Sequence, residues 1–322
     1  MVKYFSTIST QTTKLAARNL VNGNIVVFPT ETVYGIGADA LNNLAVKRIY
    51  RIKKRPKQNS LIVHINSNRL VQFWAREIPD YAIELINKFW PGPLTIVVKK
   101  NLEIRSLVSS GKNTIALRKP NNQIALDLLE SFENYGGKGV GAPSANIFTR
   151  VSTTNGIYAS EDLGKFMKED DFILEGGDSE LGLESTILDC TSNLPKIIRL
   201  GSLLKSDVEK IVAIDSEIDS NFESIGYPGN SPKHYSPRAE VRICQPEEIP
   251  FNEWVISLKG LNFKHEVKHL REFENILDYA KNLYSTLRKV DEMNLRMIYI
   301  VPPPVEGLGE VILDRIYKSA GL

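Results

Sequence analysis

A dense group of cations lies directly before a predicted strand at residues 53–64, which read KKRPKQNSLIVH. Pro56 prevents a continuous helix here, because proline lacks a backbone N–H and clashes with the preceding turn. The apolar run at 61–65 is typical of a buried strand that is entered from a loop. Cations at the edge of such a strand can be directed at an anion, although a solvated basic turn would have the same composition.

Polar side chains flank the other predicted strands in the same way. Besides His64, these positions are Thr30, Glu31, Thr32, Arg118, Ser144, Asn146, Ser185, Thr186 and Arg199. Any one of them can be structural, since Arg199 would also serve as an ion-pair partner and His64 as a core histidine. Ligand crevices of open α/β sheets form at strand ends, so the whole set favours one shared site.

The residue types in this set are suited to a phosphate-rich ligand. Cations that would bind phosphate or carboxylate, arginine with bidentate geometry, are Lys53, Arg55, Arg118 and Arg199. Neutral polar groups that would orient a small ligand come from Thr32, Asn59, Ser144, Asn146 and Thr186. Ser144 lacks a G-x-S-x-G elbow, so a covalent serine intermediate is not expected. Lys54 and Lys57 are interpreted as solvated charges.

The motifs of several other chemistries are missing. The sequence contains no G-x-x-x-x-G-K-[ST] motif and hence no P-loop. The glycines at 137, 139 and 141 are followed by Pro143, which does not suit a dinucleotide-binding turn and helix. His265 and His269 could share one face of a helix, but no neighbouring residue completes a zinc site. We interpret these two histidines as a solvated surface pair.

Composition sets the class of protein. The chain has 322 residues, 42% of them hydrophobic, and a net charge of +2, so it can form one large or two ordinary domains. This charge argues against a polycationic nucleic-acid coat, while a local basic cleft is compatible with it. Cys190 and Cys244 stand apart, which favours a reducing compartment. Without a signal-like N-terminus or an apolar run of about 20 residues, we expect a soluble cytoplasmic protein.

Periodicity predicts an α/β (α+β) fold with a twisted, mixed sheet. Helices are expected at 10–22, 44–54, 81–89, 123–132, 276–290 and 310–318. Strands are expected at 24–28, 61–65, 94–98, 114–117, 185–188, 197–200, 241–244, 254–258 and 297–301. Gly, Pro and Ser accumulate at 226–237, which is linker composition. We therefore predict a large domain at 1–205, a linker at 206–238 and a small α/β domain at 239–322.

Five motifs together resemble the YrdC-like threonylcarbamoyl-AMP synthases. They are PTETVYGIG at 29–37, K-x-R-P at 53–56 running into LIVH at 61–64, WPGPLT at 90–95, ALR at 116–118 and APSAN at 142–146. Their order and spacing also fit, and the resemblance covers about residues 10–205. The segment 228–237 resembles the linker of the two-domain form, which would make the remaining tail a smaller Rossmann-like domain.

The resemblance implies an activity. L-threonine, bicarbonate and ATP would give threonylcarbamoyl-AMP, pyrophosphate and water, the first step of the tRNA modification threonylcarbamoyladenosine (t6A). Other, downstream tRNA-modifying proteins would complete the modification, and direct tRNA binding is not required. Mg²⁺ would enter with the ATP phosphates, with no protein ligand to the metal expected. The general base, the oligomeric state, the role of the small domain and the partner that receives the product stay open.

The same resemblance implies roles for individual residues. Lys53 and Arg55 would be catalytic. Threonine contacts would come from Thr32, His64, Arg118 and Thr186. Nucleotide contacts would come from Arg55, Asn59, Thr114, Ala142, Ser144, Asn146, Ser152, Arg199 and Tyr235, the last reaching from the linker over the phosphates. The sequence departs from the family pattern at Asn59-Ser60, where a proline is expected in many relatives.

Two other functions fit parts of the sequence. One is an RNA-binding module that uses the same basic cleft, against which the net charge of +2 argues. The other is a carbamoyl-transfer domain of a larger maturation enzyme, against which the missing zinc-finger and acylphosphatase-like segments argue.

Overall fold

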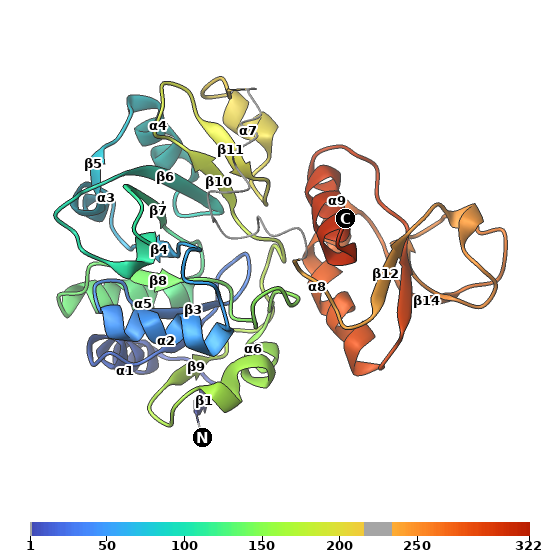
Figure 1. Ribbon diagram of the computed structural model, residues 1–322, viewed down its shortest axis with the longest axis horizontal. Coiled ribbons are helices and arrows are strands. Elements are labelled where there is room, and N and C mark those ends of the chain that lie inside the picture. The colour runs from blue at the N-terminus through green and yellow to red at the C-terminus, as the bar shows by residue number, and fades with distance from the viewer. Residues whose placement is uncertain (1, 216–233) are drawn as a thin grey trace.

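The computed structural model describes residues 2–215 and 234–322, which form two lobes (Figure 1). Within these residues the large lobe carries an 11-stranded mixed sheet and the small lobe a four-stranded sheet. The predicted α/β class with a mixed sheet and a second, smaller domain is thereby confirmed. Residues 216–233 of the predicted linker lie outside the described residues, so the linker bounds stay a prediction.

The large sheet has the strand order β1-β9-β2-β3-β8-β4-β7-β6-β10-β11, with β5 paired to β6. Its strands are β1 (Lys3–Phe5), β2 (Val26–Phe28), β3 (Gly35–Asp39), β4 (Ile62–His64), β5 (Ala75–Glu77), β6 (Leu94–Lys100), β7 (Thr114–Arg118), β8 (Val140–Ala142), β9 (Phe172–Leu174), β10 (Thr186–Asp189) and β11 (Lys196–Arg199).

The register of the central strands brings the predicted site residues together. β4 runs parallel to β7, and His64 is paired with Arg118. On its other side β4 runs antiparallel to β8, with Ile62 opposite Ala142. Neighbours in register lie about 5 Å apart. The strand ends that carry the predicted polar residues therefore meet at the middle of the sheet.

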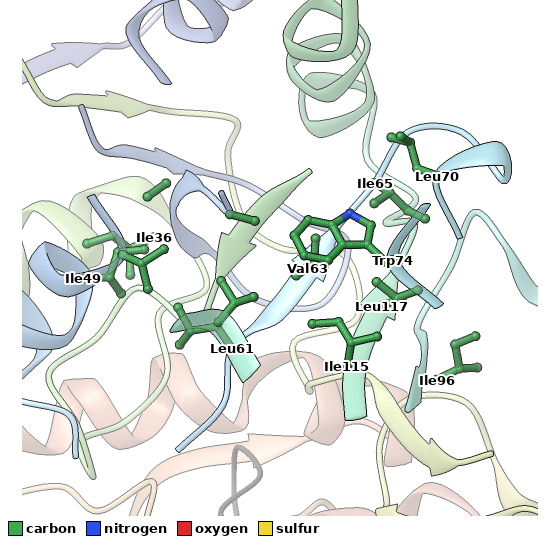
Figure 2. Packing of buried hydrophobic residues seen from close by; sticks show 14 of the residues in the cluster. Ile36, Ile49, Leu61, Val63, Ile65, Leu70, Trp74, Ile96, Ile115 and Leu117 are labelled. Carbon is green, nitrogen blue, oxygen red and sulfur yellow. The ribbon is translucent and has the colours of Figure 1, made fainter. Parts of the chain in front are cut away.

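Helices cover the large sheet: α1 (Thr10–Val21), α2 (Asn43–Lys53), α3 (Arg69–Trp74), α4 (Asp80–Phe89), α5 (Gln123–Asn134), α6 (Gly156–Leu163) and α7 (Lys205–Glu209). Asn42 caps the start of α2, because its side chain accepts the backbone N–H groups of Leu44 and Ala45. The helix ends at Lys54, whose φ of 53° is left-handed, so the chain turns before Pro56. Under α2, buried apolar side chains such as Ile49, Leu61 and Trp74 fill the core (Figure 2).

The small lobe is a parallel sheet covered by two helices. Its elements are β12 (Glu240–Ile243), β13 (Trp254–Leu258), β14 (Lys268–Phe273), α8 (Ile276–Glu292), β15 (Met297–Ile300) and α9 (Leu308–Ala320). The strand order is β12-β15-β13-β14, with all pairs parallel. Both helices lie on the side of this sheet that faces the large lobe (Figure 1). Among the described residues, no helix has the length and apolarity to cross a membrane.

Every predicted helix and strand is present within a few residues, but several elements were not predicted. The missed strands are β1, β3, β5, β8, β9 and β14, and the missed helices are α3, α6 and α7. β3 contains Gly35 and Gly37, which disfavour strands in isolation, and β14 is a polar edge strand. The shared helix face of His265 and His269 is wrong, since His269 lies in β14 and His265 in an exposed loop.

Asp171 ties the edge of the large sheet to α2, and it generates a stability prediction. Its carboxylate accepts the Ile25 and Lys168 backbone N–H groups and pairs with Arg48 Nη2 at 2.6 Å, while being itself fully buried. Asp171→Asn should therefore lower the free energy of unfolding, measured in urea, by about 3–5 kcal/mol, since Arg48 keeps an uncompensated charge. Glu77→Gln, in the exposed Glu77–Lys99 pair, should leave it unchanged. Equal effects would contradict the role of Asp171.

Candidate active site

One cavity collects side chains from the ends of the central strands. Its wall is formed by Thr30, Thr32, Val33, Tyr34, Gly35, Arg55, Ile62, His64, Arg118, Ala142, Pro143, Ser144, Glu184, Ser185, Arg199, His234 and Tyr235. The residues after β2, in β4 and β7, and around β8 all contribute, as the strand-end argument predicted. His234 and Tyr235, which follow the predicted linker motif, also line the cavity.

Arg118 forms one corner of the cavity. Its Nη2 donates to Thr32 Oγ1 at 2.9 Å and lies 2.8 Å from Glu31 Oε1, while its Nε donates to the Gly92 carbonyl. Nη1 forms no hydrogen bond with any described residue. Glu31 thus compensates the buried charge and fixes the guanidinium plane, and Nη1 stays available to a carboxylate.

His64 lies beside this corner as a neutral imidazole. Burial, and then the neighbouring Arg118 charge, lower its pKa to about 3. The edge of Phe28 packs against the ring, with 5.8 Å between ring centroids. Its Nδ1 has no hydrogen-bond partner among the described residues. The imidazole can therefore accept or orient a ligand proton without adding charge to the cavity.

Cations dominate the opposite part of the wall. Arg55 is buried and donates to the Asn59 and Ser60 carbonyls; burial, together with nearby Arg199, lowers its pKa to about 10. Arg199 donates to the carbonyl and hydroxyl of Ser185, and burial lowers its pKa as well. Burying two cations close together is costly. An anionic ligand such as phosphate would remove this cost.

Lys53 is placed differently from the prediction. It was expected to face phosphate, but it does not line the cavity. Its Nζ donates to the carbonyl of Ser144 at 2.6 Å and to that of Asn146. Burial, and then the Arg55 charge, hold the pKa of this amine well below its usual range. Lys53 therefore fixes the loop after β8, which itself forms part of the wall.

The other predicted residues lie at different distances from the cavity. Ala142 and Ser144 line the cavity. Ser152, Asn146 and Thr186 lie behind the wall, where their side chains bond to Glu184, to backbone carbonyls and to the Leu203 carbonyl, respectively. Asn59 contributes its carbonyl oxygen to Arg55 and Tyr50. Thr114 and Arg118 are at opposite ends of β7, about 13 Å apart.

Sequence reasoning assigned no role to two groups on the wall. Glu184 lies directly before the predicted Ser185 and Thr186 motif, and His234 lies directly before Tyr235. Their position next to predicted site residues could therefore have indicated that they belong to the site. Glu184 is buried; although burial opposes ionisation, Arg315 and Arg199 lower the pKa of its carboxyl to about 2. Arg315 belongs to α9, and nothing in the sequence connects it to this cavity.

Comparison with known proteins identifies the family. A profile described as "Telomere recombination", for Sua5, YciO and YrdC proteins, matches residues 18–201. A second, described as "Threonylcarbamoyl-AMP synthase, C-terminal domain", matches residues 203–321. The threonylcarbamoyl-AMP synthase of Pyrococcus abyssi is 33% identical, over 96% of this chain and 94% of its own. That of Bacillus subtilis is also 33% identical, over 95% and 92%.

The chain belongs to the threonylcarbamoyl-AMP synthase family. The crystal structure of P. abyssi Sua5 in complex with L-threonine covers 100% of this chain with 32% identity and a TM-score of 0.85. A P. abyssi Sua5 variant covers it equally, with a TM-score of 0.84. Escherichia coli YciO, 23% identical with a TM-score of 0.53, shares the fold of the large lobe. As a threonylcarbamoyl-AMP synthase the chain is an enzyme, which confirms the activity expected from the resemblance.

The donor set of this threonylcarbamoyl-AMP synthase bears on the predicted Mg²⁺. Among the described residues, no group of three or more His, Cys, Asp or Glu side chains is arranged to hold a metal ion. Glu184, the carboxylate on the cavity wall, is already held by Ser152, Tyr284 and Arg315. The entry of Mg²⁺ with the ATP phosphates stays a prediction.

The neutral state of His64 predicts a pH dependence of stability. Its pKa falls from 6.5 to about 3 on folding, so between these values the unfolded chain binds the extra proton. Stability is therefore lost as the pH falls through this window, by up to about 1.4 kcal/mol per pH unit for this group. His64→Gln should flatten the dependence of unfolding free energy on pH between 6 and 4. His265→Gln, in an exposed loop, should not; equal slopes for all three proteins would contradict the burial argument.

Proposed function

We propose that this cavity binds L-threonine, bicarbonate and ATP and that the chain converts them to threonylcarbamoyl-AMP, pyrophosphate and water. The observation that carries the proposal is the division of the wall into a compensated, hydroxyl-rich corner and a strongly cationic part. A small amino acid suits the first, and a triphosphate suits the second.

The corner around Arg118 is the proposed threonine site. Arg118 would hold the carboxylate through Nη1, because Nη2 and Nε are already engaged. Thr32 and His64 would contact the amino and hydroxyl groups. The solved structure of the P. abyssi relative is a complex with L-threonine, which supports threonine as a ligand of this chain. Thr186 stays a prediction whose hydroxyl proton already goes to the Leu203 carbonyl.

Arg55 and Arg199 are proposed to bind the phosphates of Mg·ATP. They are assisted by Ser144 and by Tyr235 from the opposite side of the cavity, which also lie on its wall. Lys53 would act by holding the Ser144 loop rather than by contacting phosphate. The remaining predicted nucleotide contacts, at Asn59, Thr114, Asn146 and Ser152, would require the cavity to extend beyond its present wall.

The proposed chemistry brings anions together. The threonine amine adds to bicarbonate-derived CO₂ to give a carbamate, whose oxygen attacks the α-phosphate while pyrophosphate leaves. Cations that neutralise the developing charge and hold the two anions in line would supply most of the acceleration. A buried cavity also keeps water from the carbamate and from the mixed anhydride product.

The alternatives carry less weight. A threonylcarbamoyl-AMP synthase matches 96% of this chain and is itself covered over 94% of its length, which favours a synthase over a carbamoyl-transfer domain. The downstream tRNA-modifying proteins, direct tRNA binding and a cytoplasmic location stay predictions.

Pyrophosphate release is the test of the proposed reaction. The purified chain with Mg·ATP should release pyrophosphate only when both L-threonine and bicarbonate are present, and mass spectrometry should detect threonylcarbamoyl-AMP. Reactions that lack one substrate at a time are the controls. Absence of release, or release that does not depend on threonine, would overturn the proposal.

Arg118 should determine the threonine requirement. Arg118→Ala should raise the KM for threonine by roughly 30-fold or more, the equivalent of the about 2 kcal/mol that a lost buried charge contact costs. The KM for ATP should change far less. Arg118→Lys keeps a charge opposite Glu31, so it separates misfolding from loss of the bidentate fork. Arg76→Ala, on the exposed edge strand β5, is the control. Equal changes in both KM values would remove the assigned role.

A further inference from the structure

The small lobe is packed closely against the cavity. Val33 and Leu183 of the large lobe share one buried apolar cluster with Leu283 and Ile312 of α8 and α9. Gly182 has a φ of +73°, and a Cβ atom there would lie 2.2 Å from the Lys281 carbonyl oxygen. Such a close backbone approach leaves no room for a side chain. The two lobes therefore meet in a specific, tightly fitted contact.

A buried charge pair lies at the centre of this contact. Glu184 Oε2 accepts Arg315 Nε at 3.1 Å and Tyr284 Oη at 2.8 Å, and Oε1 accepts Ser152 Oγ at 2.7 Å. Arg315 is completely buried and also donates to the Leu200 carbonyl. Because Glu184 lines the cavity, its charge would repel an anionic ligand if Arg315 did not compensate it.

The same two side chains of the small lobe hold Tyr235. The Tyr235 ring is stacked on Tyr284, with 5.4 Å between centroids and 22° between planes. On this ring also lies the Arg315 guanidinium, 5.1 Å from the centroid. Tyr235 has a φ of 60°, a left-handed conformation that is unfavourable for a bulky residue and persists only where its surroundings impose it.

The hydroxyl of Tyr235 is the polar group that this packing presents to the cavity. Tyr235 lines the cavity, and its buried Oη has no hydrogen-bond partner among the described residues. The backbone is held on both sides, since His234 N donates to the Lys318 carbonyl and Ser236 N to the Thr149 carbonyl. A buried, unpaired hydroxyl is costly unless a ligand completes it.

We propose that Tyr284 and Arg315 of the small lobe are positioning residues for the reaction, which together with Glu184 form an interdomain clamp. The clamp orients the Tyr235 hydroxyl toward the phosphates of bound Mg·ATP and compensates the Glu184 charge beside them. This inference rests on the proposed function and gives the small lobe a role in it. It acts through Tyr235 and Glu184, since neither Tyr284 nor Arg315 lies on the cavity wall.

A double-mutant cycle between the clamp and the hydroxyl tests this role. Calorimetry on the full chain measures its Kd for α,β-methylene-ATP in the presence of Mg²⁺. Tyr235→Phe, which removes only Oη, and Arg315→Met should each raise this Kd about tenfold or more, because a hydrogen bond to a charged group is lost. In the Tyr235→Phe background, Arg315→Met should raise the Kd by a clearly smaller factor than it does in the unchanged chain, because one of its two targets, the Tyr235 hydroxyl, is already gone and only the effect through Glu184 remains. The KM for threonine should stay nearly unchanged.

A milder variant and a matched control separate the role of the clamp from a general loss of stability. Tyr284→Phe keeps the stack but loses the hydrogen bond to Glu184, so it should give a smaller, equally coupled effect; thermal midpoints verify folding. Arg288→Met removes another buried arginine between the lobes, which pairs with Asp162 and the Val151 carbonyl, and should be additive with Tyr235→Phe. Additive effects of Arg315→Met and Tyr235→Phe would overturn the clamp. If the chain binds the nucleotide and the two substitutions are coupled but no pyrophosphate is released, only the proposed reaction is contradicted. If the chain does not bind the nucleotide, both the proposed reaction and the clamp are contradicted.

Discussion

The concentration of positive charge in a buried cavity is the constraint around which this structure is organised. Arg55 and Arg199 are buried in its wall, and Lys53 is buried directly behind it. Such a cluster is unfavourable in the absence of an anion, so the fold must supply stability elsewhere. The large core under α2 and the close contact between the lobes meet this need. The charge that opposes folding is the charge that a triphosphate requires.

Each of the two acidic groups near the cavity has an arginine partner at salt-bridge distance. Glu31 is paired with Arg118, and Glu184 with Arg315. Each carboxylate therefore has its own arginine, and each pair serves a different part of the cavity. The first pair leaves one guanidinium nitrogen available at the amino-acid end. The second removes a negative charge from the phosphate end, at the cost of making that end depend on a separate lobe.

Much of this arrangement could be predicted from the sequence. The remaining features depend on contacts between residues that are far apart in the chain or on local crowding. Apolar runs such as 61–65 and the polar residues at their ends sufficed to predict the central strands and most of the wall. The direction of the Lys53 amine could not be predicted, because two backbone carbonyls 91 and 93 residues away decide it. The contact of Arg315 with Glu184 spans 131 residues and has no local pattern. Strand β3 was missed because Gly35 and Gly37 are selected by crowding around Phe28, rather than by strand propensity.

The depressed pKa of His64 has a consequence for the lifetime of an intermediate. Carbamates lose CO₂ once a proton reaches their nitrogen, so their survival depends on how few acids surround them. An imidazole that stays unprotonated down to a pH of about 3 is no such acid at neutral pH. The amine of Lys53, whose pKa is lowered, donates its hydrogen bonds to backbone carbonyls behind the wall. The amino-acid end of the cavity thus offers hydrogen-bond donors but lacks an acidic imidazolium, which would extend the lifetime of an acid-labile adduct.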